Sequence, residues 1–165
     1  MVKWLRQSKI AMVILTVVRV WLGVLWALDG FAKVSGGFNA SGFVGAAIKN
    51  PVLTPEKTQA FGWYTSFLKD LVMPNISLFN VMVSWGELLV GLGLILGTLT
   101  TAAAFFALLM NFSYLMAGTV SVNPTYVFWE FIILIAGFNA AKIGLDHWVI
   151  PFLREKFPLL KRSVE

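Results

Sequence analysis

The chain has 165 residues, of which 58% are hydrophobic and only 13% are charged, and its mean hydropathy is +0.79. The charged share is about half that of an ordinary soluble domain, and one core of this size could not bury so much apolar surface, so the composition excludes a soluble globular protein. The net charge of +5 does not indicate nucleic-acid binding, because the basic residues cluster at the chain ends beside hydrophobic segments, where membrane topology explains them.

Four apolar segments predict four transmembrane helices. The expected spans are 10–28, 76–97, 100–118 and 125–143, each near the roughly 20 residues that cross about 30 Å of hydrocarbon. The segments are too long for barrel strands and lack a two-residue period, so helices are the expected spanning structure. We therefore predict an all-α fold, a single integral membrane four-helix bundle over residues 1–165.

The distribution of basic residues predicts the orientation of the bundle. Lys3, Arg6 and Lys9 precede the first span as in a signal peptide, but no small-residue cleavage site follows, so an uncleaved helix is expected. The side of the termini carries Lys3, Arg6, Lys9, Lys142, Arg154, Lys156, Lys161 and Arg162, and the other side carries Lys33, Lys49, Lys57 and Lys69. This excess predicts a multi-pass protein of the cell membrane with both termini in the cytoplasm. The basic tail 151–165 is expected on the anionic inner leaflet.

The one long connection, 33–75, is rich in aromatic residues rather than polar. Phe61, Tyr64, Phe67 and Leu71 recur at helical spacing, and we expect two short interfacial helices over the outer end of the bundle. Two interpretations stay open: an aromatic belt at the membrane interface, or a lid over a site in the bundle.

Ionisable residues inside the spans are the strongest functional signal, because charges in hydrocarbon are costly. Counted from the span ends at 1.5 Å per residue, Arg19 and Glu87 both lie about 13 Å from the inner edge. Glu130 lies roughly 9 Å from the outer surface, and Asn111 falls at a similar level on the third span. These residues share helix faces with small residues, a pattern typical of inward-facing stripes.

Two interpretations of this cluster stay open. The polar groups could serve only to fix helix register. Alternatively, they line a ligand or redox-substrate pocket in the outer half, where Arg19 holds an anion or a quinone carbonyl and Glu87 orients Arg19. In that pocket Glu87 and Glu130 are the candidate catalytic carboxylates, with Glu130 as proton donor or acceptor. The candidate binding residues are Arg19, Trp26, Lys33, Trp85, Asn111 and Trp129, and their aromatic members suit a flat quinone ring.

The sequence argues against a resident metal centre. It contains no cysteine, which excludes cysteine-ligated iron–sulfur clusters, and His147 is the single histidine. One histidine at the edge of a span cannot supply two axial haem ligands, nor a zinc or di-iron site. Any redox chemistry is therefore expected to use a diffusible quinone or a partner subunit.

Several short motifs, in order along the chain, resemble the DoxX family of small four-helix membrane proteins, including its DoxD branch. They are Arg19 with Gly30-Phe31-Ala32-Lys33, then Gly86-Glu87-Leu88 with the Gly91–Gly97 run, and finally Lys142-Ile143-Gly144-Leu145-Asp146. One departure is that many relatives place an arginine just after the second helix, where this chain has Thr98-Leu99-Thr100-Thr101.

The resemblance implies membrane-bound redox work, and DoxD-like proteins are linked to thiosulfate:quinone oxidoreductase. The first hypothesis is therefore a membrane subunit that passes electrons from thiosulfate or a similar small reductant to quinone. The alternatives are a non-catalytic scaffold or assembly factor that docks a soluble redox enzyme and, less favoured, a small-solute transporter. The sequence leaves open whether the chain is itself an enzyme. The expected partners are membrane lipid, quinone, a second oxidoreductase subunit and, through Gly93 and Gly97, a second copy of the chain.

Overall fold

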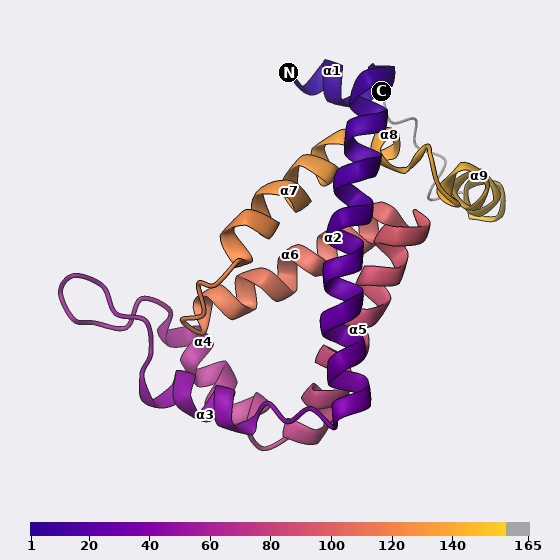
Figure 1. Ribbon diagram of the computed structural model, residues 1–165. Helices are drawn as coiled ribbons and strands as arrows, with labels where there is room; N and C mark the ends of the chain where they lie inside the picture. The colour runs from indigo at the N-terminus through magenta and orange to yellow at the C-terminus, as the bar shows by residue number, and fades with distance from the viewer. Residues whose placement is uncertain (158–165) are drawn as a thin grey trace.

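A computed structural model describes residues 1–157 of the chain, and within them every regular element is helical (Figure 1). The elements are α1 (Val2–Gln7), α2 (Lys9–Gly36), α3 (Ser41–Lys49), α4 (Gly62–Phe67), the π-helical turn η1 (Leu68–Val72), α5 (Ile76–Leu96), α6 (Thr100–Met116), α7 (Asn123–Ala136), α8 (Phe138–Ala141) and α9 (Asp146–Lys156). The same residues form no strand, and one isolated bridge joins Leu53 to Gln59. The all-α prediction is confirmed.

The long helices α2 and α5 lie side by side and run in opposite directions (Figure 1). Glycines make this approach possible: a Cβ on Gly23 would lie 2.7 Å from the Ile95 amide nitrogen, and one on Gly30 or Gly91 would overlap the backbone of Leu88 or Ala27. Since no side chain separates the two backbones at these points, the glycines fix the register of α2 against α5.

The helices α6 and α7 form a second antiparallel pair that is set at an angle to the first (Figure 1). The core between the pairs combines large and small buried side chains: Leu15, Leu22, Trp26, Leu94, Ala104, Ala107, Ile133 and Ala140. Alanines on α6 and α8 allow close helix packing without leaving cavities.

The outward surface of the helices is apolar. α2 and α5 are long and apolar enough to cross a membrane, and only 33% of the most apolar window of each helix is buried. α6 and α7 are also apolar but shorter, with 17 and 14 residues. Side chains such as Val17, Leu28, Leu89 and Phe105 are more than half exposed. Hydrocarbon is the solvent that suits such a surface, because water would leave a large apolar patch uncovered.

Two of the predicted spans differ from the helices that form. α2 continues eight residues past the expected end at Leu28, to Gly36. The predicted span 125–143 is interrupted because α7 ends at Ala136, and Gly137 takes φ 57° and ψ −130°, a conformation that L side chains rarely adopt. Hydropathy does not report this break, since the residues on both sides of it are apolar.

The connection between α2 and α5 contains two short helical units, α3 and the continuous α4–η1 helix. They share a small core of their own that includes Val44, Ala47, Tyr64, Leu68 and Val72. The Asn80 side chain of α5 accepts a hydrogen bond from the Ala40 amide at 2.8 Å, which ties the start of α3 to the helical pair. We call this end of the molecule, with α3, α4 and η1, the distal end.

The opposite end holds α1, α8 and α9, and we call it the proximal end (Figure 1). The predicted basic tail 151–165 is described here only as far as Phe157, where α9 has ended, and the rest lies outside the described residues.

The glycine contacts predict a matched pair of substitutions on α5. Gly91→Ala places a methyl group inside the backbone of α2, whereas Gly86→Ala meets only the flexible Met110 side chain at 3.5 Å. We expect Gly91→Ala to destabilise the detergent-solubilised protein by about 2 kcal/mol or more, as overpacking does. Gly86→Ala is expected to leave the thermal midpoint within about 1 °C, because an alanine is accommodated there. Equal midpoints for the two variants would contradict the register.

Candidate functional site

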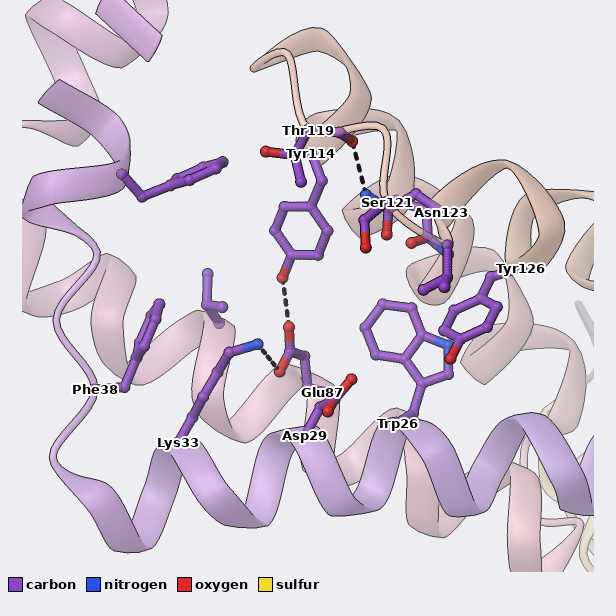
Figure 2. A pocket seen from close by; sticks show the side chains of 14 residues that line it. Trp26, Asp29, Lys33, Phe38, Glu87, Tyr114, Thr119, Ser121, Asn123 and Tyr126 are labelled. Atoms are coloured by element: carbon purple, nitrogen blue, oxygen red, sulfur yellow. Dashed lines mark hydrogen bonds and ion pairs between the residues drawn. The ribbon is translucent and has the colours of Figure 1, made fainter. Parts of the chain in front are cut away.

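A cavity of about 290 Å³ lies at the distal end, where α2, α5, α6 and the start of α7 converge (Figure 2). Its lining combines ionisable, amide, hydroxyl and aromatic side chains: Trp26, Asp29, Lys33, Phe38, Phe43, Val83, Glu87, Asn111, Tyr114, Thr119, Ser121, Val122, Asn123 and Tyr126. Four of the sequence-predicted site residues, Trp26, Lys33, Glu87 and Asn111, are brought together here.

Glu87 is the best-connected charged group in the cavity. Its side chain is 2% exposed, forms an ion pair with Lys33 and accepts a hydrogen bond from the Tyr114 hydroxyl at 2.6 Å (Figure 2). The contact follows from the register of the helices: Gly30 lies against the backbone of Glu87 and Leu88, and Lys33 stands one turn further along α2. Glu87 thereby links α2, α5 and α6.

Lys33 occupies the open side of this pair. Its side chain is 27% exposed, and its Nζ lies 5.4 Å from the centre of the Phe38 ring, within cation–π range. Because it is partly exposed, the Lys33 ammonium can pair with the buried Glu87 and still reach a bound molecule.

A second carboxylate, Glu130 on α7, lies behind the cavity wall. It is fully buried and accepts hydrogen bonds from Trp26 Nε1 at 3.0 Å and from Asn111 Nδ2 at 2.9 Å to each oxygen. Within residues 1–157 it has no cationic partner. Glu130 does not line the cavity but fixes two side chains that do. Asn111 Oδ1 is buried without a hydrogen-bond partner among the described residues and remains an available acceptor.

Aromatic rings enclose the remaining sides. Tyr126 contacts Trp26 with ring centres 6.5 Å apart, and Phe43 of α3 packs edge-on against Tyr114 at 6.4 Å. Asp29 is exposed and directs its carboxylate toward the cavity from α2 (Figure 2). Because Phe38 and Phe43 come from the connection between α2 and α5, that segment closes part of the cavity as well as covering the helix ends.

Tyr114, Asp29 and Tyr126 are site residues that the sequence interpretation did not select. A signal existed for Tyr114, since it stands one turn after Asn111 on the same helix face. The predicted binding residues Trp85 and Trp129 do not line the cavity: Trp85 is 50% exposed on the surface of the helices, and Trp129 packs beside the main core.

Arg19 lies in a different place from the other predicted site residues. It is 1% exposed and donates from Nη2 to the Ile143 carbonyl at 2.6 Å, and its guanidinium packs against Gly97, where a Cβ would overlap it. Its Nε and Nη1 have no hydrogen-bond partner among the described residues, and Asp146 supplies the nearby opposite charge. The expectation that Glu87 orients Arg19 is wrong.

The error comes from assuming that all spans end at one level. Because Gly91 contacts Ala27 and Gly30 contacts Leu88, Glu87 lies level with the distal part of α2. About eleven residues, or roughly 16 Å of helix, then separate it from the level of Arg19. Gly97, just after the end of α5, contacts Arg19, so α5 ends before it reaches the level at which α2 begins.

Asp146 organises the turn around Arg19. Its carboxylate accepts from the amides of Leu99 at 2.7 Å and Thr100 at 2.8 Å, so it caps the first turn of α6 from a distant part of the chain. Its own amide donates to the Gly97 carbonyl at 2.7 Å. Gly93 contacts Ala103 and Gly97 contacts Arg19 within the chain, so both glycines of the predicted dimerisation motif already serve internal packing.

The described residues contain no group of three metal-binding side chains. Comparison with protein families finds a match to the family described as DoxX over residues 14–119, a stretch that holds Lys33, Glu87, Asn111 and Tyr114. Comparisons with curated proteins and with solved structures find no match.

The contacts of Asp146 lead to a prediction for a second pair of variants. Asp146→Ala removes two charge-assisted hydrogen bonds and the counter-charge of a buried arginine, so we expect it to lower the free energy of unfolding by about 3 kcal/mol. Asp70→Ala on the exposed face of η1 removes the same charge without a buried partner. It is expected to change the free energy of unfolding by less than about 0.5 kcal/mol. Denaturant titration of the solubilised protein measures both values, and similar losses would refute the role given to Asp146.

Proposed function

The chain belongs to the DoxX family of membrane proteins, and from this premise we propose that it is the membrane subunit of a quinone-linked oxidoreductase. The distal cavity is the proposed site for the quinone headgroup. The observation that carries the proposal is the convergence of Lys33, Glu87, Tyr114 and Asn111 on one aromatic-walled cavity.

The size and lining of the cavity support a quinone headgroup. Its volume of about 290 Å³ is at the lower end of the roughly 300–1,000 Å³ of small-molecule sites, so it suits a single substituted ring rather than a large cofactor. Trp26, Phe43 and Tyr126 offer faces and edges for a flat ring. Any long tail would extend outside the cavity, along the apolar helix surface.

The polar groups match both redox forms of a quinone. The carbonyl oxygens of the oxidised ring need donors, and the Lys33 ammonium can supply them, because it has three N–H donors and uses one of them on Glu87. The hydroxyls of the reduced ring need acceptors, which the unpartnered Asn111 Oδ1 and the Asp29 carboxylate can supply.

Reduction of a quinone to a hydroquinone consumes two electrons and two protons. In the proposed site Lys33 delivers a proton to the ring oxygens and is protonated again from bulk water, to which the partly exposed Lys33 and the exposed Asp29 connect the site, so that both protons come from water. The two electrons come from a partner oxidoreductase subunit, since the sequence has no cysteine and a single histidine with which to hold a redox centre.

The charges of the cavity do not favour thiosulfate as its direct occupant. Asp29 and Glu87 provide two carboxylates against the single ammonium of Lys33, and Arg19 lies elsewhere. A dianion would meet net repulsion there. If thiosulfate is the reductant, the proposal assigns its binding to the partner subunit.

We further propose that α2, α5, α6 and α7 together form a four-helix bundle across the membrane, with the proximal end in the cytoplasm. The support is that Lys3, Arg6, Lys9, Lys142 and Arg154 gather at the proximal end. α6 and α7 are short for a full crossing. We therefore expect the bilayer to be thinner beside these two helices, or the two helices to stand nearly parallel to the membrane normal.

Quinone binding tests the proposal directly. We expect a tail-less dimethoxy-methyl-benzoquinone to quench the tryptophan fluorescence of the purified protein, since Trp26 lines the cavity. Lys33→Met and Glu87→Gln are each expected to raise the dissociation constant for the quinone about tenfold, because each removes a charge-assisted contact at the site. The exposed Lys49→Met serves as the control for lost charge and is expected to bind as the parent does.

A parent protein that neither binds this quinone nor retains any quinone on organic extraction would refute the proposal. That result would favour the alternative, a non-catalytic scaffold that docks a soluble redox enzyme. Flux of a small solute into proteoliposomes without an electron acceptor would favour a transporter instead.

A further inference from the structure

A second cavity, of about 400 Å³, lies at the proximal end and has a different chemical character. Four of its nine lining residues are basic and none is acidic. The cations are Lys3 and Arg6 of α1, Lys142 after α8 and Arg154 of α9, and the amides of Gln7 and Asn139 complete the polar lining.

Hydrogen bonds to the backbone hold these elements in place. Asn139, which is 2% exposed, donates from Nδ2 to the carbonyls of Leu5 at 2.7 Å and Ser8 at 3.1 Å, and so fastens α1 to α8. Arg6 donates from Nε to the Ile135 carbonyl at 2.9 Å, which fixes α1 to the end of α7. The cavity is therefore assembled from separate segments in a defined arrangement.

Three of its cations have no anionic partner within residues 1–157. Lys3, Lys142 and Arg154 form no ion pair there, and the acidic residue nearest to Lys142 in sequence, Asp146, is committed to the Leu99 and Thr100 amides. Like charges held around one concavity repel one another, and an anion bound among them would relieve this repulsion.

The elements that supply the cations also carry exposed aromatic side chains. Trp4 on α1 is 48% exposed, and Trp148 and Phe152 on α9 are 67% and 56% exposed. Tryptophan and basic residues together are typical of the level of lipid headgroups at a membrane surface. A lipid is the anion source that satisfies both features, since its phosphate would meet the cations while its chains extend beside the apolar helices.

We propose that this proximal cavity binds the phosphate of an anionic glycerophospholipid, through Lys3, Lys142 and Arg154 together with Arg6. The site is separate from the distal cavity and does not depend on the proposed quinone chemistry. It would fasten α1 and α9 to the same lipid and so stabilise the proximal end.

Native mass spectrometry of the full chain tests the assignment, with phosphatidylglycerol and phosphatidylcholine of identical acyl chains as probes. We expect the parent to retain phosphatidylglycerol at least tenfold more tightly than phosphatidylcholine. The single variants Lys3→Gln, Lys142→Gln and Arg154→Gln are each expected to weaken the binding of phosphatidylglycerol roughly fivefold. This is about the contribution of one cation near an anionic surface.

The matched control is the triple variant Lys49→Gln, Lys57→Gln and Lys69→Gln, which removes three exposed charges from the distal segment and is expected to bind phosphatidylglycerol as the parent does. Circular dichroism of each variant verifies that the helices are retained, since all six positions lie at the surface or on the partly exposed rim of the cavity. The combined variant Lys3→Gln, Lys142→Gln and Arg154→Gln removes the same number of charges from the proximal cavity, and a loss of phosphatidylglycerol binding in the control equal to the loss in this variant would overturn the proposal, because it would show attraction by net charge alone. Inorganic phosphate that displaces phosphatidylglycerol at equal concentration would overturn the lipid as the anion source.

Discussion

The close contact between the backbones of α2 and α5 is the constraint on which the rest of the structure depends. Gly23, Gly30 and Gly91 leave no room for side chains between the two helices, so only one register is compatible with their packing. That register brings Lys33 to Glu87 at one end and Arg19 to Gly97 at the other. Helix packing therefore places the two buried charges, Arg19 on α2 and Glu87 on α5, in separate sites, although their charges are opposite.

Much of the fold and part of the site could be predicted from the sequence. The apolar segments indicated the long helices, and the polar stripes correctly indicated that Trp26, Glu87 and Asn111 face the interior, because the helical period alone determines a face. The position of each polar residue along the length of the molecule is less predictable. The ends of the apolar segments do not lie at one level: α5 ends beside Arg19, in the proximal part of α2, and α7 breaks at Gly137 inside an apolar run. The Asp146 cap depends on a contact between distant segments that no local pattern reports.

The two cavities carry different charges. The distal cavity presents Glu87 and Asp29 with one lysine, backed by the buried Glu130 and its two neutral donors, whereas the proximal cavity presents only cations. A buried carboxylate without a cation is costly, so the hydrogen bonds of Trp26 and Asn111 to Glu130 serve both to stabilise it and to orient the cavity wall. Proton exchange at one end and electrostatic attachment to anionic lipid at the other would suit a small subunit that presents a quinone site to a partner enzyme.

A structure of the protein in lipid nanodiscs with a benzoquinone bound tests the central claim most directly. The account predicts ring density in the distal cavity beside Trp26, with a ring oxygen within hydrogen-bonding distance of Lys33 while Lys33 stays paired with Glu87. Density for the ring beside Arg19 at the proximal end, or a Lys33 side chain turned away from Glu87 in the bound protein, would contradict it.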